Sequence, residues 1–211
     1  MTVIGFTTPA PASDRESLLT ECRSIERYLE SGAIDFFHLR KPDAPPHAIT
    51  ALLRNIHPAL RHRLVVHSAF AESLSLGAGG IHLSLRNASE RVPEGMRTRF
   101  FTTRSCHSLQ EIIEIPADAH RYITLSPIFD SISKEGYLSK FRLDDGALAN
   151  VIDGKNVIAL GGVTPDRFCQ LSIAKFGGAA LLGYLWGLEN TPAPQVTAIL
   201  DARRIADVTS R

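Results

Sequence analysis

A loop of hydroxyl side chains ending in a lysine is the stretch of this sequence best suited to bind an anion. It reads Ser126-Pro-Ile-Phe-Asp-Ser-Ile-Ser-Lys134 and follows the apolar run Tyr122–Leu125. The hydroxyls of Ser131 and Ser133 stand beside the ammonium group of Lys134, and such groups together can hold a phosphate or pyrophosphate. A solvated turn has the same residue types, so the place of the loop at a strand end gives the phosphate interpretation its weight.

Two glycine turns later in the chain suit the same kind of ligand. Gly161-Gly162 follows the apolar run Val157–Leu160, and Gly183 follows the run Ala179–Leu182. Glycines let backbone N–H groups approach an anion closely, and a short helix opening at Gly183 would add the positive end of its dipole. We predict that these turns hold phosphate; the alternative is that they are two tight turns with a structural role only.

Arg40 and His67 also fall where predicted strands end. The guanidinium of Arg40 has the fork geometry that matches phosphate oxygens, although an arginine there is as often part of a rim salt bridge. We predict that both residues line the ligand pocket.

Histidines are concentrated in or just after the predicted strands, at His38, His67, His82 and His107. His107 is our candidate for proton transfer, because imidazole both donates and accepts near neutral pH. It lies two residues after Ser105, which would orient the substrate or the histidine, and beside a helix that begins near Ser108. The alternative is a capping or rim histidine. No HxH or HExxH spacing is present, so we expect no metal site, and we expect His82 to pack in the core.

Composition limits the class of protein. The chain has 211 residues and a net charge of +1, which gives no electrostatic reason to expect nucleic acid. No apolar run is long enough to suggest a membrane span. Three cysteines, Cys22, Cys106 and Cys169, form no CxxC pair and are expected to be reduced thiols of a cytoplasmic protein. Cys106 lacks a visible third orienting group, so we do not expect it to be a nucleophile.

Short apolar runs alternate with amphipathic segments along the whole chain. The predicted strands are Val3–Thr7, Ile34–Leu39, Leu64–His67, Gly80–Leu83, Arg99–Thr103, Tyr122–Leu125, Val157–Leu160 and Ala179–Leu182. The predicted helices lie near residues 14–31, 49–62, 70–76, 108–115, 144–151, 165–176 and 194–205. This order predicts one α/β domain over residues 1–211, a (β/α)8 TIM barrel, with a doubly wound sheet as the structural rival. The barrel is favoured because the polar residues follow the strands and would meet at one face.

The order of the motifs resembles the thiamine phosphate synthase family, which also contains the thiazole tautomerases. The motifs are His38-Leu-Arg40, Gly80-Ile-His-Leu83, Ser105-Cys-His107-Ser108-Leu109, Ser126-Pro-Ile-Phe129 through Ser133-Lys134, and Ala159-Leu-Gly-Gly-Val163. The resemblance covers about residues 33–187 and implies a (β/α)8 barrel that binds a thiazole phosphate. It also aligns His107 with the histidine that the tautomerase branch uses for proton transfer.

The sequence departs from the synthase pattern where that pattern binds magnesium and pyrophosphate. The family's Gln-x-Arg-x-Lys reads His38, Arg40 and Pro42 here, so the lysine is absent or displaced to Lys41. Its Asn-Asp pair reads His67-Ser68, and its second aspartate aligns with Asn87. A hard cation such as Mg²⁺ would lack its charged oxygen ligands at these positions.

The resemblance therefore favours a thiazole tautomerase-like isomerase acting on a thiazole phosphate, for which no cofactor is expected. Two alternatives stay open. The first is thiamine phosphate synthase, a transferase that condenses hydroxymethylpyrimidine pyrophosphate with thiazole phosphate and would need magnesium. The second is a protein that binds a phosphate metabolite without catalysis. In each case the expected partner is a small molecule, and a homodimer is the assembly we allow for.

Overall fold

The computed structural model describes residues 1–84, 87, 99–130, 138–187 and 196–209, and its strands form a closed (β/α)8 barrel in sequence order. The strands are β1 (Thr2–Phe6), β2 (Phe36–Leu39), β3 (Leu64–Val66), β4 (Gly80–Leu83), β5 (Phe101–Cys106), β6 (Tyr122–Leu125), β7 (Val157–Ala159) and β8 (Gly178–Leu181). The helices are α1 (Arg15–Glu30), α2 (His47–Asn55), η1 (Pro58–Arg63), α3 (Phe70–Ser75), α4 (Leu109–Ile113), α5 (Gly146–Ile152), η4 (Pro165–Arg167), α6 (Phe168–Ile173), α7 (Gly183–Trp186) and α8 (Val196–Thr209). The predicted barrel is confirmed.

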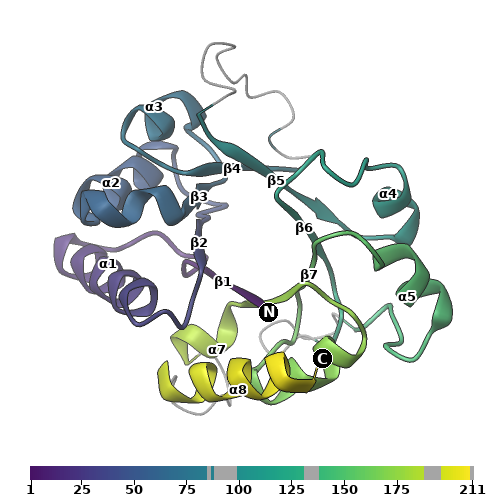
Figure 1. Ribbon diagram of the computed structural model, residues 1–211. Helices are drawn as coiled ribbons and strands as arrows, with labels where there is room; N and C mark the ends of the chain where they lie inside the picture. Colours follow the sequence, from purple (N-terminus) through teal and green to yellow (C-terminus); the bar gives the residue numbers. More distant parts are fainter. Residues whose placement is uncertain (85–86, 88–98, 131–137, 188–195, 210–211) are drawn as a thin grey trace. The chain divides into compact units, whose positions relative to one another are not determined.

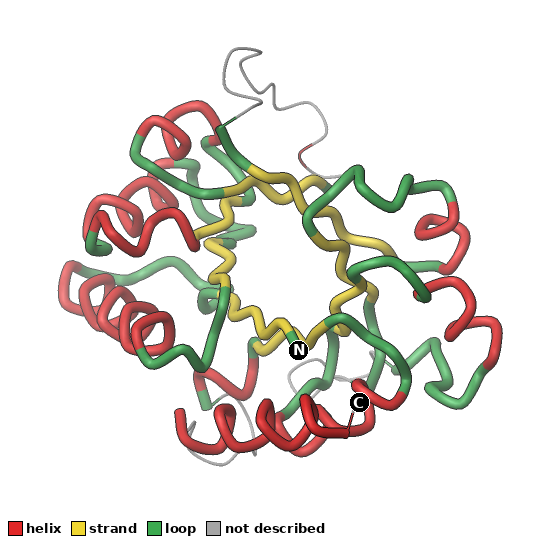
Figure 2. The backbone as a smooth tube through the Cα atoms, in the orientation of Figure 1, coloured by secondary structure: helices red, strands yellow, loops and turns green. Residues whose placement is uncertain are grey.

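The chain divides into two compact units, one made of Met1–Ile4 with Arg104–Arg211 and the other of Gly5–Thr103. In each unit the helices lie outside the strands (Figure 2). No helix in the described ranges is long and apolar enough to cross a membrane. The expectation of a single domain stays a prediction.

In the unit Gly5–Thr103, three neighbouring strands pair in parallel with a fixed register. His38 of β2 is level with Val65 of β3, and Val65 is level with Gly80 of β4. Levelled residues of paired strands point to the same face, and the face alternates with each residue. The outward face of β2, with Phe37 and Leu39, packs in a core closed by the apolar faces of α1 and α2, and these core side chains are almost fully buried.

The other unit is built in the same way. β6 pairs in parallel with β7, and β7 with β8. Helix α8 packs along α6 and η4, and Ile199 of α8 is fully buried. The N-terminal ammonium group of Met1 lies 2.5 Å from a carboxylate oxygen of Asp207 in α8. Figure 1 shows the start of β1 near α8.

Three predicted boundaries are wrong for identifiable reasons. The fifth strand runs to Cys106 rather than Thr103, because the carbonyl of Cys106 still accepts a hydrogen bond from the N–H of Ser126 (3.2 Å). The second helix stops at Asn55 and a separate 3-10 turn starts at Pro58, since proline cannot continue an α-helix. The sixth helical segment divides into η4 and α6 and ends at Ile173, because Lys175 has the positive φ (65°) typical of a residue just beyond a helix C-terminus.

Helix α1 begins with a capping box formed by Asp14 and Ser17. The side chain of Asp14 accepts a hydrogen bond from the N–H of Ser17 (2.7 Å), and the Ser17 hydroxyl accepts one from the N–H of Asp14 (3.1 Å). These bonds satisfy two N–H groups that the helix leaves without internal partners.

We expect Asp14→Ala to lower the free energy of unfolding by about 1 kcal/mol, because it removes this cap. Thr20→Ala, on an exposed position of the same helix, should change it by less than about 0.5 kcal/mol. Urea denaturation of both variants measures the difference. Equal effects would show that the cap does not stabilise α1.

Candidate functional site

His107 lies directly after β5, where a capped helix fixes its backbone. Ser108 is the N-cap of α4, and its hydroxyl accepts a hydrogen bond from the N–H of Glu111 (3.2 Å). The Glu111 carboxylate in turn accepts a hydrogen bond from the N–H of His107 (3.0 Å). The pattern Ser-x-x-Glu at 108–111 is a helix-start signal that the sequence analysis did not use. The imidazole is therefore carried by a rigid turn with its side chain exposed.

The ring of His107 is oriented by Ser126, a residue that sequence reasoning did not select. Nδ1 lies 3.3 Å from the carbonyl oxygen of Ser126 and 3.2 Å from its hydroxyl oxygen. A carbonyl oxygen can only accept, so this contact favours the tautomer in which Nδ1 carries the proton. Nε2 then has the lone pair and can accept a proton from a ligand.

Ser105 and Cys106 take opposite sides of β5. Cys106 is fully buried, and burial raises the pKa of its thiol to about 11, with the nearby Glu111 carboxylate adding to the effect. A protonated, buried thiol is a poor nucleophile, in agreement with the sequence analysis. Ser105 is half-buried, and the ring contacts of His107 go to Ser126 instead. A role for Ser105 in orienting the substrate stays a prediction.

The glycine pair after β7 packs closely against the loop after β6. Gly161 and Gly162 both have positive φ (98° and 61°), and a Cβ on Gly162 would lie 2.2 Å from the carbonyl oxygen of Asp130. The carbonyl of Gly161 accepts a hydrogen bond from the N–H of Phe129 (3.0 Å). Only glycine fits this approach, so the pair has a structural function whether or not it also binds phosphate.

The other predicted phosphate contacts divide into two groups. Gly183 begins α7, as the sequence analysis expected of a short extra helix. Ser131, Ser133 and Lys134 lie outside the described residues. Phosphate binding by all of these residues stays a prediction.

A surface cavity of about 780 Å³ lies beside the glycine pair. Gly162, Phe129, Asp130 and Arg167 are among its lining residues, and the Arg167 guanidinium lies 4.8 Å from the centre of the Phe129 ring. His107 is not among the lining residues described. The glycine pair therefore lies at a surface cavity, and His107 is not part of the described lining of that cavity.

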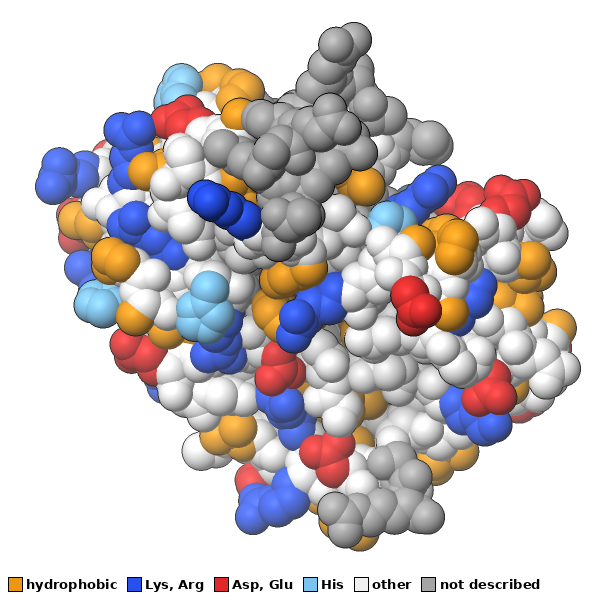
Figure 3. Space-filling model, turned by 45° about the horizontal axis from the view of Figure 1, so that its top comes forward, with side chains coloured by type: hydrophobic (Ala, Val, Ile, Leu, Met, Phe, Trp, Pro, Cys, Tyr) orange, Lys and Arg blue, Asp and Glu red, His pale blue; other side chains and the backbone are white. Residues whose placement is uncertain are grey.

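Charged side chains of both signs are interspersed on the face shown in Figure 3. This agrees with the net charge of +1. A mixed surface of this kind does not favour a polyanion as partner.

In the other unit, Arg40 follows β2 and its backbone is fixed by Thr7. The Thr7 hydroxyl donates to the carbonyl of Arg40 and accepts from its N–H, both at 2.8 Å. The guanidinium is close enough to His67 to contribute to lowering the pKa of that imidazole, after the larger effects of burial and of the neighbouring histidines. Arg40 and His67 therefore lie near each other, and their role in lining a ligand pocket stays a prediction.

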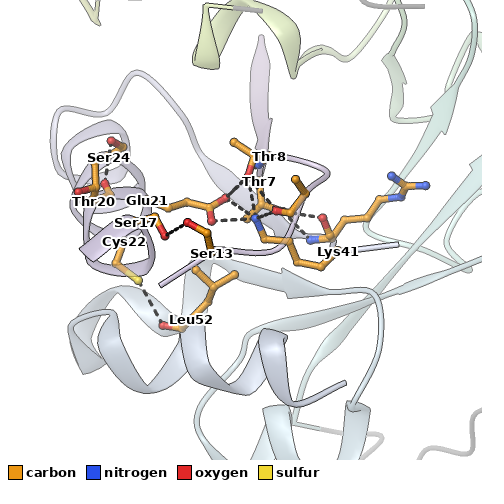
Figure 4. A network of polar contacts seen from close by, with 12 residues as sticks. Thr7, Thr8, Ser13, Ser17, Thr20, Glu21, Cys22, Ser24, Lys41 and Leu52 are labelled. Atoms are coloured by element: carbon orange, nitrogen blue, oxygen red, sulfur yellow. Dashed lines mark hydrogen bonds and ion pairs between the residues drawn. The ribbon is translucent and has the colours of Figure 1, made fainter. Parts of the chain in front are cut away.

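Lys41 is part of a buried ion pair. Its ammonium group lies 2.8 Å from both carboxylate oxygens of Glu21 and donates to the hydroxyl of Thr8 and the carbonyl of Ala10, each at 2.7 Å (Figure 4). Both charged side chains are less than a tenth exposed. The lysine is fully engaged in joining α1 to the segment after β1, so it does not replace the lysine of the synthase pattern.

The side-chain amide of Asn87 also forms hydrogen bonds with backbone groups. Its amide nitrogen donates to the carbonyls of His67 (3.1 Å) and His82 (2.6 Å), and its amide oxygen accepts from the N–H of Ser84 (2.8 Å). We call this arrangement the Asn87 clasp. An aspartate could not donate these two hydrogen bonds, and the amide is not directed to a cation. Together with the His67-Ser68 pair, this means that the residues present do not fit the magnesium site of a synthase.

Three histidines that the sequence separates are grouped together: His38 on β2, His67 directly after β3, and His82 on β4. His38 is fully buried and its Nδ1 lies 2.9 Å from Nε2 of His67. His82 is 3% exposed, as expected for a packed core histidine, and its Nδ1 lies 2.8 Å from the hydroxyl of Thr103. Burial holds the pKa of His38 and of His67 well below the ordinary value, with the charge of His82 acting in the same direction. Both rings are therefore neutral at pH 7.

The fold and the strand-end residues define a (β/α)8 protein with a hydrogen-bonded histidine and glycine turns suited to an anion. The chain belongs to the family described as thiamine monophosphate synthase, whose family model matches residues 10–184.

Solved structures and a curated relative agree with this membership. The thiamine phosphate pyrophosphorylase of Bacteroides thetaiotaomicron is 29% identical, with a TM-score of 0.72 and coverage of 100% of this chain and 98% of that chain. The thiamine phosphate pyrophosphorylase of Pyrococcus furiosus, 18% identical with a TM-score of 0.68 over 99% of this chain and 96% of that chain, supports the fold. The thiamine-phosphate synthase of Latilactobacillus sakei is 25% identical over 67% of this chain and 62% of its own length.

We expect Lys41→Met to lower the free energy of unfolding by about 3–5 kcal/mol, because it leaves the Glu21 carboxylate buried without its partner. The matched control is Arg54→Met, which breaks an exposed ion pair with Glu72 and should cost less than about 1 kcal/mol. Denaturant unfolding measures both. A Lys41 variant as stable as the control would contradict the structural role of this lysine.

We also expect one thiol of the native protein to react readily with a disulfide reagent. Burial raises the pKa of Cys22 to about 12 and that of Cys106 to about 11, whereas Cys169 is partly exposed. Titration with the disulfide reagent at pH 8 should therefore detect one thiol per chain in the native protein and three after unfolding. Cys169→Ser should abolish the rapid reaction; if it does not, Cys106 is more reactive than its burial implies.

Proposed function

We propose that this protein is a thiazole tautomerase-like enzyme that moves a proton on a thiazole phosphate carboxylate. The observation that carries the proposal is the orientation of His107 by the carbonyl of Ser126, which favours an Nε2 lone pair. An imidazole in this tautomer takes a proton from one position of a ligand and returns it to another.

Tautomerisation requires little from the protein beyond this proton transfer. One bond to hydrogen breaks, another forms, and the imidazole carries the proton between them, so atoms and charge balance without a cofactor. The substrate must be held by its phosphate while the proton moves. We assign that task to Ser131, Ser133, Lys134, Gly161, Gly162 and Gly183, with Ser105 orienting the substrate. Arg40 and His67 stay predicted ligand contacts of the unit Gly5–Thr103.

Synthase activity is the second candidate, because relatives and solved structures of this family have synthase or pyrophosphorylase names. Loss of pyrophosphate would develop negative charge that magnesium and a lysine neutralise in that reaction. In this chain Lys41 is paired with Glu21 and the Asn87 clasp uses the amide that aligns with an aspartate. Proton transfer is the reaction that the described residues support better.

A two-arm assay on purified protein distinguishes the candidates. One arm supplies thiazole phosphate, hydroxymethylpyrimidine pyrophosphate and magnesium and measures thiamine phosphate. The other supplies the non-aromatic tautomer of thiazole phosphate carboxylate and follows its aromatisation by absorbance. Conversion only in the second arm supports the proposal, product in the first arm overturns it, and silence in both favours a non-catalytic binding protein.

We expect His107→Gln to reduce turnover in the second arm by about 100-fold or more, because glutamine cannot accept the proton. His62→Gln, which changes an exposed histidine outside the predicted site, is the control and should leave turnover unchanged. Affinity for the phosphorylated ligand should be nearly the same in both variants. Full activity of His107→Gln would remove His107 from the reaction.

A further inference from the structure

The His38–His67–His82 cluster is a group of three imidazoles whose candidate ligand atoms all lie within 4.8 Å of one another. The rings of His67 and His82 stack with centres 4.3 Å apart, and the ring of His38 is 5.2 Å from each of them. The proposed proton transfer uses none of these rings as an acid or base. A cluster of this kind therefore needs its own physical explanation.

The strand register makes the cluster a rigid arrangement. His38, Val65 and Gly80 are level on three paired strands, so they share a face, and His67 and His82 lie two residues beyond Val65 and Gly80 on that same face. His38 and His82 are carried on strands, which position ligands more accurately than loops do. His67 directly follows β3, and its N–H donates a hydrogen bond to the carbonyl of Leu39 in β2 (3.3 Å).

The distances suit a small transition-metal ion after slight adjustment. A tetrahedral Zn²⁺ with imidazole ligands at about 2.0–2.1 Å requires its ligand nitrogens to be about 3.3 Å apart. The 2.9 Å contact between Nδ1 of His38 and Nε2 of His67 would open by about 0.4 Å, and the widest separation of 4.8 Å would close by about 1.5 Å. Both changes require the side chains to rotate about χ1 and χ2. The hydrogen bond between the two rings also requires one of these nitrogens to be an unprotonated acceptor, which is the form that binds a metal.

The surroundings have the features of a second coordination shell. The hydroxyl of Thr103 engages Nδ1 of His82, which directs a metal to Nε2 of that ring. The Asn87 clasp joins the carbonyls of His67 and His82 and so fixes the backbone of two of the three ligands. The ring of Phe6 packs 4.6 Å from His38 and provides an apolar wall, while the partial exposure of His67 gives an ion a way in.

We propose that the His38–His67–His82 cluster is a binding site for a divalent transition-metal ion of the zinc class. Three imidazoles hold the ion, and the fourth tetrahedral position is open to water or to an oxygen of a bound anion, as in zinc sites with three protein ligands. Neutral imidazoles favour Zn²⁺, Co²⁺ or Ni²⁺ over the hard Mg²⁺. This site shares position 67 with the magnesium site of the synthase pattern but has imidazole ligands in place of carboxylates, and it does not depend on the proposed tautomerase activity.

The test uses the full chain without a histidine tag, freed of metal by a chelator and dialysed. Zn²⁺ is titrated by calorimetry, and Co²⁺ is titrated while its visible absorption is followed. We expect one equivalent of each ion, an intense Co²⁺ spectrum typical of tetrahedral coordination, and an X-ray absorption spectrum of the zinc protein with three imidazole nitrogens at about 2.0 Å.

Variants identify the ligands. His82→Gln should weaken zinc binding by more than about 100-fold, and Thr103→Val, which keeps all three imidazoles, should weaken it by about 10–100-fold. His62→Gln is the matched control and should bind as the original chain does. Circular dichroism establishes that each variant is folded. Should His82→Gln not fold, the X-ray absorption spectrum of the original chain decides alone.

Three results would overturn the proposal: the absence of stoichiometric binding at micromolar zinc, sulfur or all-oxygen coordination in the absorption spectrum, or undiminished binding by folded His82→Gln. The assay of tautomer conversion is run separately, with and without added zinc. A metal-binding protein that fails this assay would retain the metal site and lose the proposed function, so the two failures are distinguishable.

Discussion

Parallel strand pairing in a fixed register is the constraint on which the rest of this structure depends. The register determines which side chains share a face of the sheet. It therefore fixes which residues, although far apart in sequence, become neighbours. Where the shared face is buried, every polar group needs a partner. The buried imidazoles meet this requirement, since His38 pairs with His67 and His82 with Thr103. Lys41, on the opposite face from His38 by alternation, is paired with Glu21.

The departures from the synthase pattern form a consistent set because each is satisfied locally. Lys41 has four hydrogen-bonding contacts and the side-chain amide of Asn87 has three, so each has partners within the protein. The region of the family's pyrophosphate chemistry is instead rich in neutral imidazole. His107 belongs to the other unit and has its own support from Ser126 and the cap of α4. Family membership therefore establishes the barrel, while the reaction must be argued from these individual contacts.

The fold was largely predictable from the sequence, because eight apolar runs with helical segments between them have few other arrangements. Boundaries were less predictable: the fifth strand is extended by a hydrogen bond from Ser126 that no local pattern reveals. The site shows the same division. His107 was found from its place after a strand, but its partner Ser126 is 19 residues away, and the histidine cluster has no motif spacing because its members come from three strands. The lysine at position 41 was visible, but its burial against Glu21 depends on how α1 packs.

The Asn87 clasp has a consequence for how the chain could change. An aspartate at this position would place a carboxylate against the carbonyl oxygens of His67 and His82, where like partial charges repel. The order of substitutions would therefore matter: acidic residues elsewhere on the strand ends could be introduced first, with a cation to balance them, and position 87 could become acidic only afterwards. The effect of an acidic residue at position 87 would thus depend on the residues already present around it. The amide of Asn87 thus restricts the order in which residues of this barrel could be replaced by the acidic ligands of the synthase pattern.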